Sequence, residues 1–122
     1  MNDELKAEDL RNRTKRFALR IIRLYSALGK SGAAQVVGRQ LLRSGTSAGA
    51  QYREACRARS VAEFVSKMES AAQELDETLY WLELLIEGGL VKKGLLEPLV
   101  REANELTAIF VASSKTAKKG KC

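Results

Sequence analysis

The stretch SVAEFVSKMESAAQELDETLYWLELLIEGG, residues 60–89, decides the fold class because it has the pattern of one long amphipathic helix. Ser60 and Glu63 form a capping box, in which the serine oxygen accepts from the glutamate amide and the carboxylate reaches back. Gly88 and Gly89 end the pattern, as glycines commonly do at helix C-termini. Between these signals the apolar residues recur at helical spacing: Phe64, Met68, Ala71, Leu75, Leu79, Leu82 and Ile86.

Three further helical patterns surround this one. Residues 3–28 form the first, with an apolar stripe ahead of the glycines of GKSG. Residues 33–55 form the second, whose inner face is mostly small and has Gly45 and Gly49 beside it, so that a neighbouring backbone can approach closely. The fourth opens near Pro98, which suits a first helical turn, and its inner face carries Leu99, Ala103, Leu106, Phe110 and Ser113. These patterns predict an all-α protein, an antiparallel up-down four-helix bundle.

The length and composition bound the domain organisation. A chain of 122 residues and 13.5 kDa holds one domain. We place this domain at residues 1–114 and expect a basic, disordered tail, KTAKKGKC, at residues 115–122. The N-terminal residues have no apolar core of a secretory signal, and no apolar run is long enough to span a membrane. With two cysteines that are expected to be free thiols, these features predict a cytoplasmic protein that contacts no membrane.

The absence of histidine excludes most catalytic chemistry. A histidine general base, a Ser-His-Asp triad and a histidine-bound zinc are all impossible, and we expect no catalytic residue, metal or cofactor. The carboxylates of residues 61–87 form a solvated face rather than a metal site. Cys56 lies between Arg53 and Arg57, which could make its thiol reactive, but it has no partner base. We therefore favour a packed or surface cysteine and predict that the protein is not an enzyme.

The net charge of +6 conceals a segregation of charge along the chain. Residues 1–60 carry +8, residues 61–90 carry −6, and residues 91–122 carry +4. Basic side chains gather on the first two helices, and arginine suits phosphate because its planar fork binds two oxygens. The candidate nucleic-acid-binding residues are Arg16, Arg20, Arg23, Arg39, Arg43 and Arg59. The alternative is that such arginines pair with the acidic third helix, at Glu69, Glu74, Asp76 and Glu77.

The third helix also has more apolar surface than one stripe can bury. Tyr80, Trp81 and Leu84 project from sides other than the stripe, and exposed aromatic residues commonly mark interfaces. We therefore expect these three residues to contact another subunit in a homo-oligomer. The alternative is that the connection at residues 90–96 folds over them.

Residues 40–85 resemble the central signature of a bacterial family of four-helix bundles, the 23S rRNA intervening-sequence proteins. The matching elements are a Gln-Leu-x-Arg-Ser start, a Thr-Ser pair before small residues, an Arg-x-Ser linker, and Glu-Phe at the start of the long helix. The residues that carry them are Gln40, Leu41, Arg43, Ser44, Thr46, Ser47, Arg59, Ser60, Glu63 and Phe64. The chain departs from the family pattern at Gln51, where Asn is common, and at Gly29, where a Pro is common nearby.

This resemblance implies a ring-like homopentamer with no established enzymatic activity. It also implies similarity to the accessory proteins of diversity-generating retroelements, which engage a reverse transcriptase and its RNA. On both grounds we predict a cytoplasmic, non-enzymatic, oligomeric bundle whose basic surface binds RNA, DNA or a nucleoprotein such as a reverse transcriptase complex. The alternative is a structural or protein-binding adaptor without nucleic-acid affinity, in which residues 79–85 hold the partner.

Overall fold

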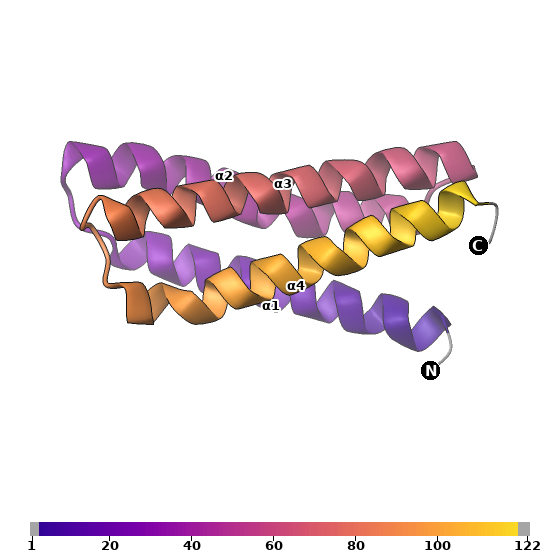
Figure 1. Cartoon of the computed structure of the whole chain (residues 1–122), viewed down its shortest axis with the longest axis horizontal. Coiled ribbons are helices and arrows are strands. Elements are labelled where there is room, and N and C mark those ends of the chain that lie inside the picture. The colour runs from indigo at the N-terminus through magenta and orange to yellow at the C-terminus, as the bar shows by residue number, and fades with distance from the viewer. Residues whose placement is uncertain (1–2, 120–122) are drawn as a thin grey trace.

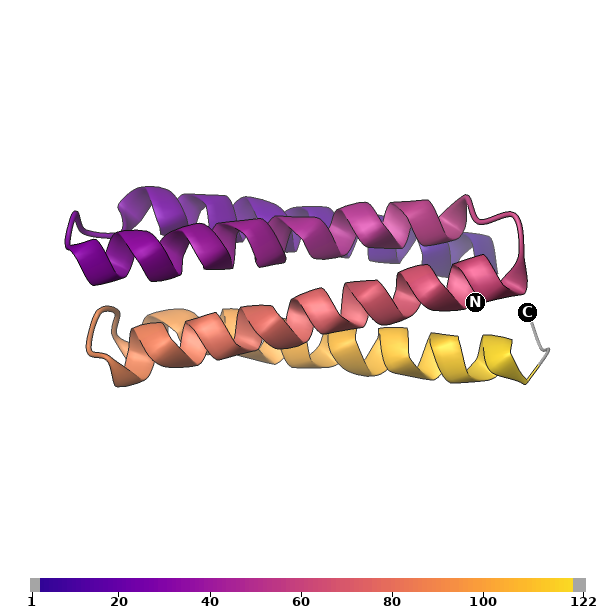
Figure 2. The same ribbon diagram turned by 90° about the horizontal axis from the view of Figure 1, so that it is seen from above.

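The computed structural model describes the backbone of residues 3–119 and the side chains from Asp9 to Lys119. Within this range the chain forms four long helices: α1 (Asp3–Ala27), α2 (Gly32–Cys56), α3 (Val61–Glu87) and α4 (Lys93–Lys118). Successive helices run antiparallel, so the start of α1 and the end of α4 lie at the same end of the molecule (Figures 1 and 2). The expected all-α, up-down four-helix bundle is confirmed.

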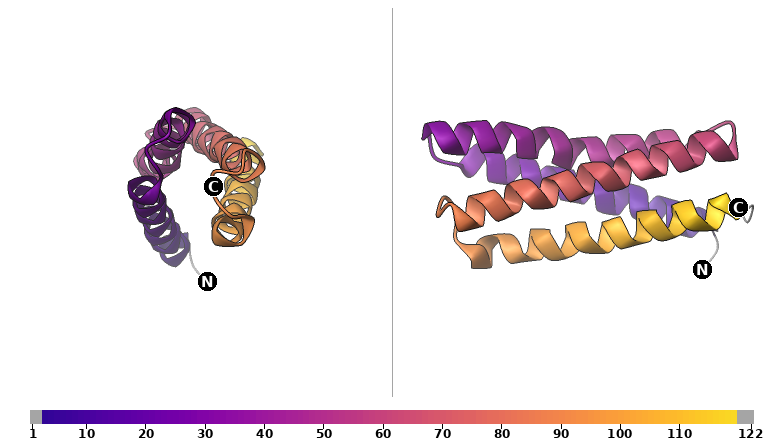
Figure 3. Two further views of the ribbon diagram at one scale, coloured as in Figure 1. Left: turned by 90° about the vertical axis from the view of Figure 1, so that its left-hand side faces the viewer. Right: turned by 45° about the horizontal axis from the view of Figure 1, so that its top comes forward.

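The helices follow one another along an arc, with α1 and α4 at its two ends (Figure 3). Helix α3 packs extensively on both α2 and α4, and α1 packs on α2, whereas α1 and α4 have little contact with each other. Helix α1 is therefore attached mainly through α2, and the arrangement of the α1–α2 flank depends on how these two helices meet.

Local sequence signals start and stop α3 nearly as expected. The Ser60 hydroxyl accepts from the Glu63 backbone N–H at 3.0 Å, which confirms half of the capping box. The Glu63 carboxylate accepts from the backbone N–H of Arg59 instead of Ser60, at 3.0 Å. At the other end, Gly89 adopts a φ of 71°, and the N–H groups of Gly89 and Leu90 donate to the carbonyls of Ile86 and Leu85. This is a Schellman ending, which needs glycine at the left-handed position.

The core is one continuous cluster along the inner faces of the helices. The predicted stripe of α3 is partly wrong, because Thr78 and Leu85 are fully buried while Leu79 and Ile86 are only half-buried. The two packed neighbours of α3 widen its buried face beyond a single stripe. Thr78 tolerates this burial because its hydroxyl oxygen lies 2.8 Å from Ser44 Oγ and 2.7 Å from the carbonyl oxygen of Glu74.

Helix α4 differs from the prediction at both ends. It begins at Lys93 rather than near Pro98, because Leu96 is buried in the core and holds the extra turn despite the proline. It continues to Lys118, so residues 115–118 are helical and not a disordered tail. Ser114 and Ala117 are buried there, whereas Ser113, the inner residue we expected, is half-buried. Residues 120–122 of the expected tail lie outside the described residues.

Candidate nucleic-acid interface

Gly45 and Gly49 of α2 allow α1 to pack closely against this helix. A Cβ atom added at Gly45 would lie 2.9 Å from Ile21 Cγ1, and one added at Gly49 would lie 3.2 Å from Thr14 Cβ. These separations leave no room for a side chain without movement of α1 or its residues. The expectation that this small face admits a neighbouring backbone is therefore confirmed, and the neighbour is α1.

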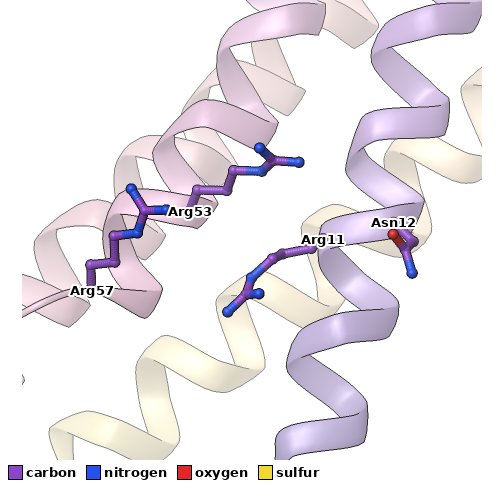
Figure 4. Close-up of a pocket in the computed structure, with 4 residues that line it drawn as sticks. All are labelled: Arg11, Asn12, Arg53 and Arg57. Atoms are coloured by element: carbon purple, nitrogen blue, oxygen red, sulfur yellow. The ribbon is translucent and has the colours of Figure 1, made fainter.

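The close packing of α1 on α2 brings together three arginines that are distant in sequence. Arg11 of α1 and Arg53 and Arg57 at the C-terminal end of α2 line a pocket of about 320 Å³, together with Asn12. Arg11 and Arg53 extend into the space between the two helices, Arg57 lies along the C-terminal end of α2, and the Asn12 amide points away from this space (Figure 4). We call Arg11, Arg53 and Arg57 the three-arginine pocket.

The three-arginine pocket gathers positive charge from two helices. None of its arginines forms an ion pair with a carboxylate of residues 9–119. The adjacent Glu54 pairs with Lys67 at 3.0 Å. Arg53 and Arg57 lie at the C-terminal end of α2, where the terminal carbonyls of the helix favour positive charge. The pocket is therefore suited to an anion, which arginine forks bind with two hydrogen bonds each.

Beneath this flank, Tyr52 is buried and stacks on Phe110 of α4, with ring centroids 5.3 Å apart. Burial, together with a hydrogen bond that involves Cys56, raises the pKa of Tyr52 far above its ordinary value. Cys56 is a free, half-buried cysteine that packs against the core cluster. Of the two environments that the sequence predicts for it, packed or surface, Cys56 therefore lies in a partly packed one.

The predicted arginines of α1 lie on a different flank from the three-arginine pocket. Arg13 reaches across to α4, where it donates from Nη2 and Nε to the Glu102 carboxylate at 2.7 and 3.1 Å. Arg16 and Arg20 follow at three and seven residues and so share this side of α1, with Arg23 continuing the row. Arg16 and Arg23 are exposed and Arg20 is half-buried. None of the three pairs with a carboxylate in the described part of the chain.

For Arg43 the alternative prediction holds, that arginines pair with carboxylates of the acidic third helix. It contacts Glu74 at 3.2 Å and also Glu77, whose carboxylate accepts from Trp81 Nε1 at 3.0 Å. Its charge is therefore largely compensated within the chain.

The remaining predicted arginines are available to a ligand. Arg39 is exposed and has no ion-pair partner within residues 9–119. Arg59 is exposed in the α2–α3 connection, and its backbone N–H, but not its guanidinium, bonds to Glu63. The structure therefore brings together Arg11, Arg53 and Arg57, and it leaves the six predicted residues dispersed over both flanks.

Two of the three predicted interface residues are partly covered by their own chain. Tyr80 is 53% exposed, whereas Trp81 and Leu84 are half-buried, and Trp81 packs against the core cluster. Tyr80 and Trp81 meet edge-on, with centroids 5.1 Å apart. In the first turn of α4, which the sequence assigns to the connection, Leu96 is buried but Leu95 is 70% exposed, so apolar surface remains beside the C-terminal end of α3.

The part of the chain that the structure describes contains neither a metal site nor a membrane-spanning helix. Residues 9–119 contain no group of three cysteine or carboxylate side chains that could hold a metal ion. No helix in the described range is long and apolar enough to cross a membrane.

The fold and the charged surface define a class: a small all-helical bundle with a basic flank formed by its first two helices. The sequence pattern of the family described as 23S rRNA-intervening sequence protein matches residues 7–112, and the chain belongs to this family. A crystal structure of a protein of unknown function from the S23 ribosomal protein family of Bacteroides thetaiotaomicron VPI-5482 has a TM-score of 0.85 and 37% identity. The match covers 91% of this chain and 99% of that one. No functionally curated protein matches the chain.

Proposed function

We propose that this protein is a cytoplasmic, non-enzymatic, oligomeric four-helix bundle that binds nucleic acid or a nucleoprotein through its basic flanks. The observation that carries the proposal is the three-arginine pocket, in which Arg11, Arg53 and Arg57 line one concave surface and form no ion pair with a carboxylate of residues 9–119. Unpaired arginines that line a concave surface are suited to phosphate, and net positive charge favours association with polyanions.

The α1 row of Arg16, Arg20 and Arg23 supplies a second group of unpaired cations, separate from the pocket. A duplex or a folded RNA presents phosphates at regular intervals, so two basic flanks on one molecule can contact several of them. Aromatic residues are scarce on these flanks, which favours contact with the phosphate backbone over stacking of single-stranded bases.

Charge reversal tests this proposal with a matched control. The triple substitution Arg16→Glu, Arg20→Glu and Arg23→Glu is expected to abolish the binding of labelled RNA and DNA in an anisotropy titration. A control triple, Lys30→Glu, Lys92→Glu and Lys115→Glu, makes the same change in net charge at other exposed positions that lack an ion-pair partner within residues 9–119. The control is expected to retain most of the binding. Equal loss in both triples would show that net charge alone acts and would contradict a site on α1.

Homo-oligomerisation is part of the proposal, with Tyr80, Trp81 and Leu84 at the contact and a pentamer as the state that the family resemblance implies. It is supported by the exposure of Tyr80 and Leu95 at one end of α3 and α4. A ring would repeat the basic flanks around an axis and add avidity. Sedimentation at micromolar concentration checks this; a species of 13.5 kDa would contradict it.

A partner such as a reverse transcriptase and its RNA belongs to the same proposal, since a nucleoprotein presents phosphates as well.

The alternative function, a protein-binding adaptor, predicts a different result in the same titration. If the wild-type protein binds neither RNA nor DNA at low salt, the basic flanks do not serve nucleic acid, and a protein partner at the Tyr80 surface takes their place.

A further inference from the structure

The three-arginine pocket differs from the rest of the basic surface in its geometry. Arg16, Arg23 and Arg39 are single exposed side chains, whereas Arg11, Arg53 and Arg57 share one concave space of about 320 Å³. Figure 4 shows Arg11 and Arg53 entering the gap between α1 and α2 from opposite sides, with Arg57 just beyond the C-terminal end of α2. A row of separate cations can follow a strand, but a pocket receives one group.

Fixed helix packing keeps the pocket in place. Gly49 lies against Thr14, and Gly45 against Ile21, so the separation of α1 and α2 beside the pocket is set by contacts that allow no extra atom. The helix positions that carry the three arginines are thus fixed relative to one another before any ligand arrives, and a preorganised site loses less entropy on binding. Within residues 9–119 no carboxylate forms an ion pair with these arginines, and the adjacent Glu54 is paired with Lys67, so a bound anion would relieve their mutual repulsion.

The number of arginines indicates which anion fits. A phosphomonoester has three terminal oxygens and a charge of about −1.5 to −2 at neutral pH. A phosphodiester has only two free oxygens and one negative charge, and a carboxylate likewise has two oxygens. Three arginine forks therefore match the oxygens and the charge of a monoester better than those of a backbone phosphate.

We propose that the three-arginine pocket binds a terminal phosphomonoester, that of a nucleic-acid strand end. This inference rests on the proposed function, because it takes the nucleic acid as the source of the monoester. The pocket then distinguishes phosphorylated ends from hydroxyl ends, while the α1 row contacts the backbone without that distinction.

The experiment compares oligonucleotides of one sequence that carry a 5′-phosphate, a 3′-phosphate or hydroxyls at both ends. Anisotropy titrations at fixed salt are expected to give about tenfold tighter binding for one phosphorylated end, the worth of one charge-assisted hydrogen bond. The two phosphorylated probes identify which end is bound. The double substitution Arg53→Gln and Arg57→Gln is expected to reduce that ratio to about one.

The matched control is the double substitution Arg16→Gln and Arg23→Gln on the other flank of α1. It removes the same charge from exposed positions, and it is expected to weaken all three oligonucleotides equally and keep the preference for a phosphorylated end. All four arginines are exposed, so the helical circular dichroism spectrum should be unchanged in both variants.

A second readout tests the pocket without an oligonucleotide. Adenosine 5′-monophosphate is expected to shift the side-chain Nε–H signals of Arg11, Arg53 and Arg57 in an NMR titration, whereas adenosine is not. Equal binding of all three oligonucleotides would overturn this inference and leave the proposed function intact. If the wild-type protein binds no oligonucleotide but the monophosphate still shifts the arginine signals, the proposed function is contradicted, and the pocket binds the monoester of a small ligand and not a strand end. Absence of both effects would overturn the inference.

Discussion

Arg13 and Glu102 form a forked pair between α1 and α4, with Nη2 2.7 Å and Nε 3.1 Å from the two carboxylate oxygens. Both side chains are about four-fifths buried, and the Glu102 hydrogen bond, ahead of the opposing effect of burial, raises the pKa of Arg13. Because α1 and α4 otherwise have little contact, this pair is a principal link between the two ends of the arc.

The first prediction concerns that link. Arg13→Ala leaves a largely buried carboxylate without its donor and is expected to lower the free energy of unfolding by about 1–2 kcal/mol. Urea denaturation followed by circular dichroism measures the change. Arg16→Ala, at an exposed position, is the control and should cost less than about 0.5 kcal/mol. Equal effects of the two substitutions would show that the Arg13–Glu102 pair adds nothing to stability.

The second prediction concerns the seat of α1 on α2. Gly45→Ala places a methyl group 2.9 Å from Ile21 and is expected to destabilise the protein by about 1–3 kcal/mol, despite the better helix propensity of alanine. Gly94→Ala is the control, since a Cβ atom there meets nothing within 4 Å, and it should stabilise α4 by about 0.5 kcal/mol. Thermal melts compare the two. A Gly45→Ala protein as stable as the wild type would contradict the close packing of the helices.

Much of the fold could be predicted from sequence because its signals are local. The capping box, the glycines after Ile86 and the helical periodicity each depend on residues within a few turns. The burial of Thr78 and Leu85 could not be predicted from one stripe, since it depends on α2 and α4 together covering α3. The early start of α4 likewise depends on a core position for Leu96 that Pro98 conceals.

The candidate site was harder to predict for the same reason. Arg11 and Arg53 are far apart in sequence, and only the packing of α1 on the glycines of α2 makes them neighbours. The signal was present, because Gly45 and Gly49 mark the face that receives another helix. The sequence alone favours the row on the opposite flank of α1. It also favours Arg43, whose partners, Glu74 and Glu77, lie on a different helix.

The third prediction concerns alkaline pH. Burial raises the pKa of Tyr52, so the unfolded chain loses this proton near pH 10 while the native protein keeps it. The contribution of Tyr52 to the free energy of unfolding is therefore constant below pH 10 and falls above it by about 1.4 kcal/mol per pH unit. Urea midpoints measured from pH 9 upward should fall less steeply for Tyr52→Phe than for the wild type. Tyr80→Phe, at an exposed position, should follow the wild type; the reverse order would refute this assignment.

The fourth prediction compares an arginine that pairs with carboxylates with one that has no ion-pair partner within residues 9–119. Arg23→Ala, in the α1 row, is expected to weaken nucleic-acid binding and to reduce the magnitude of the salt slope by about 0.9, the value for one phosphate contact on duplex DNA. Arg43→Ala should leave the slope unchanged, because Glu74 and Glu77 already compensate its charge. Titrations at several salt concentrations measure both slopes. A larger effect from Arg43 would mean that it leaves its carboxylates to bind the ligand.

The fifth prediction is the central one, that the basic flanks of α1 and α2 bind nucleic acid through phosphate. Its most direct test is the binding constant of the wild-type protein for a duplex, measured by anisotropy between about 50 and 200 mM salt. We predict a straight line of log K against log salt with a slope of about −2.7 or steeper, as expected for three or more neutralised phosphates. Absence of binding at the lowest salt, or a slope near zero, would contradict the account.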